Sequence, residues 1–284
     1  MALSPFVLSQ HLVPQHLLSR AAGLVADSHA AAIRDPFIKW FIERYGVDMK
    51  EAADPDPRSY SSFNEFFTRA LKPDARPLEG DEKTLISPAD GTISQLGEIR
   101  RGRIFQAKGQ SFSLAELTAE PENRLSAFEG GAFSTIYLSP RDYHRVHMPL
   151  GGVLEKMTFI PGRLFSVNPK TTEEVPRLFA RNERVVAWFR TDFGPMAVVL
   201  VGAMIVASIE TVWAGRVAPA GNRLAMENYQ GTNQHLSLAR GEEMGRFRLG
   251  STVILALPRD TLRWRSGQGP GETVRMGQAM GDRV

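Results

Sequence analysis

Four polar residues of the sequence have side chains that could act as acids, bases or nucleophiles. Asp90 precedes a glycine in a proline-containing turn, His144 and His147 lie three residues apart, and Ser251 follows Gly250. A serine, a histidine and an aspartate that meet in space make a nucleophile, its base and the group that orients the base. Sequence spacing alone does not show that Asp90, His147 and Ser251 meet.

The same residues also have ordinary structural interpretations. Asp before Gly is a common turn pair, and Gly-Ser before the apolar run from Val253 to Leu257 is typical of the start of a strand. The hydrolase elbow Gly-x-Ser-x-Gly is not present around Ser251. The functional interpretation therefore depends on the rest of the chain.

A zinc site is another interpretation of the histidine pair. It needs a third ligand, and only His235 and carboxylates are available, without a recognisable spacing. The chain has no cysteine, which excludes disulfides, thiolate metal sites and cysteine nucleophiles. We expect no metal.

The composition limits the class of protein. With 284 residues, 43% of them hydrophobic, the chain can form one large domain or two small ones. The net charge is only +3, from 34 Lys and Arg against 31 Asp and Glu, and the basic residues are spread along the sequence, so we expect no nucleic-acid partner. A mild positive charge is compatible with an anionic membrane surface or anionic substrates.

Contact with a membrane is expected to be peripheral. The longest apolar run covers residues 196–207, whereas a spanning helix needs about twenty residues. Residues 1–10 lack a basic segment before an apolar core, so no secretory signal is expected.

Helices are the first elements expected along the chain that positions the four polar residues. Residues 1–46 are predicted to form amphipathic helices, one of them within 11–29 and a second starting at Asp35-Pro36. The second has a wide aromatic stripe that includes Trp40 and Phe41. Such a stripe packs on its own domain or lies in a membrane interface.

After Pro77, short β-rich runs alternate with turns. They predict a mainly antiparallel β core, and thus an α+β protein. Residues 214–248 are predicted to be a long functional or mobile loop. We expect three regions: an N-terminal helical, membrane-docking region at 1–76, a β-rich catalytic core at 77–262, and a disordered tail at 263–284. The predicted strands are 84–87, 92–96, 103–107, 133–138, 153–160, 184–190, 196–203, 205–213 and 253–257.

Taken together, the motifs resemble those of the bacterial, pyruvoyl-dependent phosphatidylserine decarboxylases. They follow the family's order over residues 60–258, and each is weak alone while the set is highly specific. A valine-alanine-serine at 206–208 departs from the family, which has glycine in the middle. The motifs are Asn64-Glu65-Phe66-Phe67-Thr68-Arg69, Ser87-Pro88-Ala89-Asp90-Gly91, Tyr143-His144-Arg145-Val146-His147-Met148-Pro149, Gly162-Arg163-Leu164-Phe165-Ser166-Val167-Asn168-Pro169, Val201-Gly202-Ala203, Gly241-Glu242-Glu243-Met244-Gly245-Arg246-Phe247 and Leu249-Gly250-Ser251-Thr252.

The resemblance implies that Asp90, His147 and Ser251 form a self-processing triad. His147 would take the proton of Ser251, Asp90 would orient His147, and the serine oxygen would attack the carbonyl of Gly250. Ser251 would end as a covalent pyruvoyl group (pyruvate as cofactor) that forms a Schiff base with phosphatidylserine. The products would be phosphatidylethanolamine and CO2, with His144 acting in the decarboxylation as proton donor or by positioning the carboxylate.

The resemblance also implies partners and a location. The chain would be cut into a large chain 1–250 and a small chain 251–284, and pairs of these heterodimers would associate. The enzyme would act on a membrane phospholipid, bound peripherally on the cytoplasmic side of the cell membrane. Two alternatives remain at this point: a triad serine hydrolase that acts on a lipid ester without cutting itself, and a non-catalytic membrane-binding module.

Overall fold

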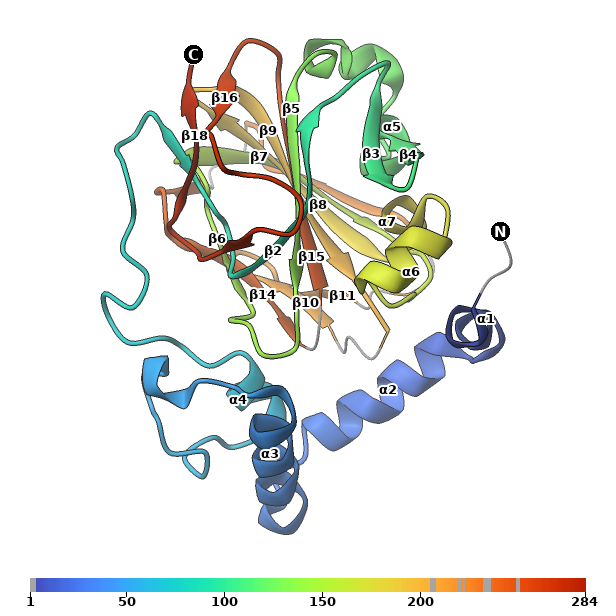
Figure 1. Ribbon diagram of the computed structural model, residues 1–284, viewed down its shortest axis with the longest axis vertical. Coiled ribbons are helices and arrows are strands. Elements are labelled where there is room, and N and C mark those ends of the chain that lie inside the picture. Colours follow the sequence, from blue (N-terminus) through green and yellow to red (C-terminus); the bar gives the residue numbers. More distant parts are fainter. Residues whose placement is uncertain (1–3, 205–207, 219–220, 222, 232–235, 249–250) are drawn as a thin grey trace.

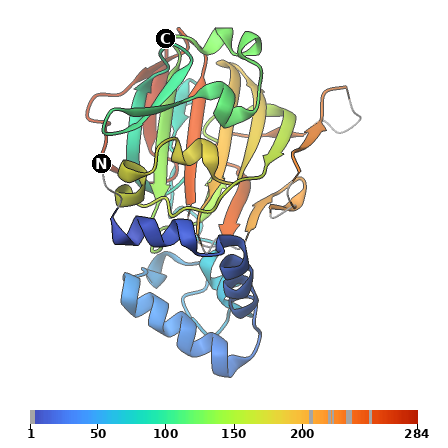
Figure 2. The same ribbon diagram turned by 90° about the vertical axis from the view of Figure 1, so that its right-hand side faces the viewer.

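The computed structural model describes residues 4–204, 208–218, 221, 223–231, 236–248 and 251–284. Figure 1 shows a β-rich body with helices from the start of the chain beneath it, and Figure 2 shows the same two layers from the side. The α+β class with a mainly antiparallel β core is confirmed.

The N-terminal helices are α1 (Pro5–Leu12), α2 (Gln15–Ala26), α3 (Ala31–Tyr45) and α4 (Phe63–Phe67). The Ser62 hydroxyl accepts a hydrogen bond from the backbone N–H of Glu65, which sets the start of α4. α3 begins at Ala31, one turn before the predicted start at Asp35. The carbonyl of Ala30 accepts the N–H groups of Ile33 and Arg34, so a complete turn precedes Pro36.

The central element of the body is a nine-stranded antiparallel sheet in the order β12-β7-β8-β9-β15-β5-β2-β17, with β13 beside β7. Its strands are rich in β-branched residues, which pack well on a pleated surface. Their bounds are β2 Gly91–Glu98, β5 Ala132–Leu138, β7 Gly152–Ile160, β8 Arg184–Thr191, β9 Gly194–Gly202, β12 Ala225–Asn228, β13 Ser237–Leu238, β15 Ser251–Leu257 and β17 Thr273–Val274.

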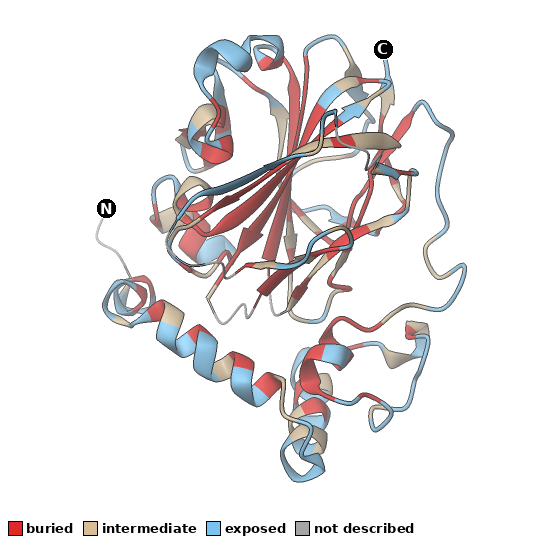
Figure 3. Cartoon of the chain, turned by 180° about the vertical axis from the view of Figure 1, so that it is seen from behind, coloured by how far each residue is buried: buried red, intermediate tan, exposed pale blue. Residues whose placement is uncertain are grey.

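Each face of this large sheet is buried, as Figure 3 shows for its strands. The inner face packs on a second sheet, β11-β10-β14-β6, through a cluster that includes Val185, Val253 and Phe247. The opposite face packs on short helices and a hairpin, through a cluster that includes Ile254 and Phe179. The remaining elements are β1 Thr84–Ile86, β3 Arg103–Ala107, β4 Gln110–Ser113, β6 Arg145–His147, β10 Ser208–Thr211, β11 Gly215–Ala218, β14 Glu243–Arg248, β16 Leu262–Trp264, β18 Ala279–Arg283, α5 Leu114–Thr118, α6 Pro169–Glu174, α7 Leu178–Arg181 and the 3-10 turns Met49–Glu51, Glu122–Arg124 and Ser126–Phe128.

Two predictions about the second half of the chain are wrong. The tail 263–284 is not disordered: β18 pairs with β1, β17 pairs with β2, and Met280 is fully buried. Its many glycines and arginines serve turns and an exposed face, while its few apolar residues enter the core. The segment 214–248 is not one long loop either, because its described residues form β11 to β14.

Candidate active site

Ser251 is the first residue of β15, which lies between β5 and β9 in the middle of the large sheet. It pairs with Leu138 on one side and with Gly202 on the other. Its side chain is fully buried, and within the described residues its hydroxyl has no hydrogen-bond partner. A buried hydroxyl without a partner is unusual and calls for a functional explanation. Gly250, on the other side of the predicted cleavage site, lies outside the described residues.

The hydroxyl of Ser251 faces the second sheet. Side chains alternate along a strand, so Val253 points to the same side as Ser251. Val253 belongs to the inner cluster together with Val146 of β6 and Phe247 of β14. The serine therefore faces the sheet that carries the histidine segment.

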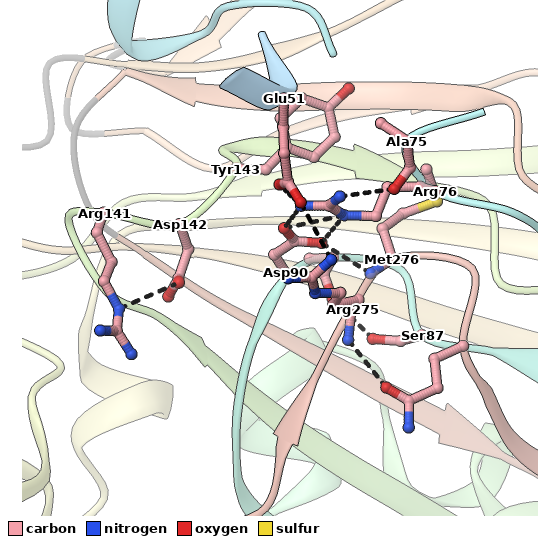
Figure 4. A network of polar contacts seen from close by, with 12 residues as sticks. Glu51, Ala75, Arg76, Ser87, Asp90, Arg141, Asp142, Tyr143, Arg275 and Met276 are labelled. Carbon is pink, nitrogen blue, oxygen red and sulfur yellow. Dashed lines mark hydrogen bonds and ion pairs between the residues drawn. The ribbon is translucent and has the colours of Figure 1, made fainter. Parts of the chain in front are cut away.

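Asp90 lies in the turn before β2 and is held by four hydrogen bonds. The backbone N–H of Met276 donates to it at 2.8 Å, and Nε of Arg76 donates to its two oxygens at 2.9 and 3.1 Å. Nη2 of Arg76 donates to Asp90 as well and also to Glu51, at 2.7 Å. Figure 4 shows this arrangement, in which Arg76 lies between the two carboxylates. The side chain of Asp90 is thus held in position by residues other than His147.

Arg76 is a site residue that the motifs did not indicate. Its side chain is only 5% exposed. Burial lowers the pKa of Arg76, but the hydrogen bonds that Arg76 donates to Asp90 and Glu51 outweigh this effect, so the net pKa is raised. The hydrogen bond from Arg76 holds the pKa of Glu51 below its usual value. The only sequence signal for this role was the position of Arg76 next to Pro77, in the segment that joins the helical region to the β core.

His147 ends β6 next to the Asp90 turn, where its backbone N–H donates to the carbonyl of Pro88 at 2.8 Å. Its Nδ1 lies 2.8 Å from the carbonyl of Gly241 and its Nε2 lies 3.0 Å from the hydroxyl of Tyr143. A carbonyl only accepts, so Nδ1 carries the proton and Nε2 has the lone pair. Burial lowers the pKa of His147, which favours this neutral form.

The hydrogen bond expected between His147 and Asp90 is not formed in this arrangement. Both ring nitrogens of His147 have other partners, and Asp90 acts on it only through its charge, which raises the pKa of His147 slightly against the effect of burial. The expected hydrogen bond between Ser251 and His147 is not formed either, because within the described residues the Ser251 hydroxyl has no partner. The register of the sheet does relate Asp90 to Ser251. Thr92 and Thr252 both pair with Tyr137 of β5, so Asp90 and Ser251 enter the sheet at nearly the same level on either side of β5.

His144 lies just before β6 and is fully buried. Its Nδ1 donates to the carbonyl of Asp142 at 2.8 Å, its ring centre lies 4.0 Å from that of Phe67 in α4, and its Nε2 has no hydrogen-bond partner within the described residues. Burial lowers the pKa of His144 to about 3. The site therefore contains a neutral imidazole whose free lone pair is shielded from water by the helical region.

The described residues contain neither a cluster of metal-ligating side chains nor a helix that could span a membrane. None of their His, Cys, Asp and Glu side chains gather in the groups of three that a metal ion needs. His235, the other candidate ligand, lies outside the described residues. No described helix is both long and apolar enough to cross a bilayer.

Known proteins resemble this chain over almost its whole length. A family model described as phosphatidylserine decarboxylase matches residues 63–282, and one described as PSD matches residues 5–46. The phosphatidylserine decarboxylase proenzyme of Bordetella avium (strain 197N) is 58% identical over 275 residues, which cover 97% of this chain and 93% of the relative. The proenzymes of Hahella chejuensis (strain KCTC 2396) and Marinobacter nauticus (strain ATCC 700491 / DSM 11845 / VT8) are 56% and 55% identical, covering 97% of this chain and 93% and 96% of the relatives.

Proposed function

This chain belongs to the phosphatidylserine decarboxylase family and is a decarboxylase, and we propose that it cuts itself between Gly250 and Ser251 and then converts phosphatidylserine to phosphatidylethanolamine and CO2. The observation that carries the proposal is the fully buried hydroxyl of Ser251 at the start of the central strand, which has no hydrogen-bond partner among the residues that the structure describes. A hydroxyl that is consumed during maturation needs no permanent hydrogen-bond partner. The position therefore fits a serine that becomes a pyruvoyl group.

In the self-cleavage, Ser251 is the nucleophile and His147 is the base. The serine oxygen attacks the carbonyl carbon of Gly250, and the peptide nitrogen of Ser251 leaves, so that an ester replaces the amide. Loss of the α-proton of Ser251 then expels the Gly250 carboxylate, and water replaces the nitrogen, which leaves as ammonia. Tyr143 donates its hydroxyl proton to Nε2 of His147 in the uncut chain, so it must yield that position or pass the serine proton on.

Asp90 acts through charge and position in this scheme. A carboxylate near His147 stabilises the imidazolium that forms when the base takes a proton. Arg76 and the N–H of Met276 keep this carboxylate in place. We therefore assign Arg76 as a positioning residue for Asp90.

A pyruvoyl group formed from Ser251 would supply the electron sink for the decarboxylation. We assign His144 to the decarboxylation step, and its imidazole is neutral before the substrate binds. Its free Nε2 is a hydrogen-bond acceptor until a substrate carboxylate lies beside it, and that negative charge favours the imidazolium. When CO2 departs, the imidazolium can return a proton to the carbon.

The helical region is proposed to dock on the cytoplasmic face of the cell membrane. α2 and α3 expose several large apolar side chains, among them Leu17 (66% exposed), Leu24 (78%) and Trp40 (51%). Such residues are favoured in the interface of a bilayer. Phe41 does not belong to this surface, because it is 5% exposed and packs in a separate aromatic core with Phe63. This separate core supports a boundary near Pro77 between a docking region and a catalytic core.

On the family resemblance alone, we propose that the large and small chains form a heterodimer and that two heterodimers associate. The alternative of a lipid-ester hydrolase uses the same serine without cutting the chain. Neither the decarboxylase nor the hydrolase is proposed to need a nucleic acid or a metal.

Intact-mass analysis of the purified protein separates these functions. We expect fragments corresponding to 1–250 and 251–284, the smaller one with a blocked N-terminus, and we expect Ser251→Ala to remain uncut and inactive. An uncut 31.5 kDa chain that still decarboxylates phosphatidylserine would refute the proposal. An uncut chain that reacts at Ser251 with a fluorophosphonate would favour the hydrolase.

A further inference from the structure

Glu183 is a buried carboxylic acid that the scheme above does not use. It lies just before β8, and its side chain makes no hydrogen bond or ion pair within the described residues, although it is only 6% exposed. Burial raises the pKa of Glu183 to about 7. A buried ionisable group without a partner destabilises a fold, so such groups are found mainly where they serve a function.

The neighbouring arginines do not neutralise Glu183. Arg184 donates to three backbone carbonyls, at 2.7 Å each, on the opposite face of the sheet. The guanidinium of Arg181 lies 4.9 Å from the centre of the Phe165 ring. The carboxyl group is therefore left free to meet a cation from outside the chain.

The register of the large sheet places Glu183 in line with Ser251. The N–H of Gly202 donates to the carbonyl of Glu183 at 2.8 Å, and Gly202 pairs directly with Ser251. Residues opposite one another on antiparallel strands point to the same face. Since neighbouring strands lie about 4.8 Å apart, the backbones of Glu183 and Ser251 are separated by roughly 10 Å across β9.

The residues two positions further along each strand confirm this shared face. Val185, Leu200 and Val253 all belong to the inner cluster. In the large sheet β9 lies between β8 and β15.

Gly202 lies between Glu183 and Ser251 in the sheet and places no side chain of its own between theirs. A Cβ atom there would lie 3.2 Å from the carbonyl oxygen of Glu183, 3.6 Å from Leu164 and 3.9 Å from Ile209. Leu164 and Ile209 are thus the apolar side chains next to this position. A carboxyl group and the proposed reactive residue thus flank Gly202 on the same face of the sheet.

We propose that Glu183 is a catalytic residue that accepts a proton from the ammonium group of the aminophospholipid substrate. An N–H bond of the ammonium breaks, an O–H bond forms on Glu183, and the nitrogen lone pair becomes free to attack the carbonyl derived from Ser251. The proton leaves on the oxygen that departs as water when amine and carbonyl condense, which regenerates the carboxylate. The inference rests on the proposed function, because it requires a carbonyl at position 251.

Glu183→Gln tests this role, because it keeps the shape of the side chain and removes the proton acceptor. Three measurements on the full-length protein are compared with the parent: self-cleavage by intact mass, reaction with hydroxylamine by mass shift of the small chain, and borohydride capture of phosphatidylserine on that chain. Hydroxylamine is uncharged at neutral pH and needs no base. We expect normal cleavage and normal hydroxylamine labelling, with capture of the lipid amine slowed about a hundredfold or more.

Asp192→Asn is the matched control, because Asp192 is an exposed carboxylate in the turn between β8 and β9, at the far end of the same hairpin. It should behave like the parent. Capture of phosphatidylserine by Glu183→Gln at the parent rate would overturn the proposal, and so would an equal loss of hydroxylamine labelling, which indicates a structural role. If Glu183→Gln is not cut, Glu183→Asp decides by the same criteria: it keeps a carboxylate closer to the backbone and should be cut with slowed lipid capture, and normal capture overturns the inference. A parent protein that is neither cut nor labelled would instead refute the proposed function.

Discussion

The contact between Arg76 and Asp90 allows a quantitative test of how the site is held. The side chains are 5% and 11% exposed, and Arg76 contributes three of the four hydrogen bonds of the carboxylate. Arg76→Met removes the cation and leaves Asp90 with only the N–H of Met276. Removing one partner of a buried ion pair typically costs ~3–5 kcal/mol, because the other charge stays buried without compensation.

The measurement uses the Ser251→Ala background, so that every variant is a single uncut chain. Urea denaturation followed by tryptophan fluorescence gives the free energy of unfolding. Arg76→Met should lower it by ~3–5 kcal/mol. Adding Asp90→Asn removes the stranded charge, and the double variant should recover about 1–3 kcal/mol of that loss.

The matched control is Arg265→Met. Arg265 also donates two hydrogen bonds to one carboxylate, that of Asp282, at 2.7 and 2.8 Å, but the two side chains are 40% and 47% exposed. An exposed pair contributes only about 0–1 kcal/mol. Equal losses for Arg76→Met and Arg265→Met, or strict additivity of the Arg76 and Asp90 substitutions, would refute the argument that burial makes the first pair important.

Three further predictions concern other parts of the molecule. Burial lowers the pKa of His144 to about 3 from an ordinary value of 6.5, so between these values the unfolded chain binds a proton that the folded chain does not. Stability should therefore fall as the pH drops below 6.5, by at most ~1.4 kcal/mol per pH unit for this residue, and His144→Asn in the Ser251→Ala background should flatten the curve of urea midpoint against pH; parallel curves would contradict the assignment. Leu24→Glu should lower the fraction of protein that sediments with anionic lipid vesicles. Val284→Glu should leave this fraction unchanged, because Val284 is also an exposed apolar residue but lies at the other end of the molecule. A lower fraction for both variants, or for neither, counts against docking through the helices. Met280→Ala should lower the free energy of unfolding by ~2–5 kcal/mol, because the side chain is fully buried, and a change below 1 kcal/mol would show that the C-terminal strands are not part of the core.

Much of the fold follows from local patterns in the sequence. The predicted strands 84–87, 103–107 and 184–190 correspond to β1, β3 and β8 within a residue or so, because β-branched runs between turn residues are a strong local signal. The predicted strand 205–213 overlaps β10, although its first three residues lie outside the described residues. The capping pattern from Ser62 to Glu65 likewise marks the start of α4.

The predictions that were wrong or missing depend on long-range packing, which cannot be predicted from local sequence patterns. β18, with the sequence Ala-Met-Gly-Asp-Arg, has little strand propensity of its own, yet it is held between β1 and β16. At the site, the motifs identified Asp90, His144, His147 and Ser251, but not Arg76, whose role depends on a contact that only the folded chain creates. The positions of Asp90 and Ser251 on either side of β5 could not be derived from their separation in the sequence.

The placement of β15 has a consequence for the life of the protein after the proposed cut. This strand has β5 on one side and β9 on the other, and the segment that follows it adds β17 beside β2 and β18 beside β1. The small chain thus contributes β15, β17 and β18 to sheets of the large chain, and it cannot dissociate without unfolding the large chain. Each molecule would keep the small chain with which it was synthesised, so a reactive group lost to a side reaction could not be renewed by exchange, and only new synthesis would restore activity.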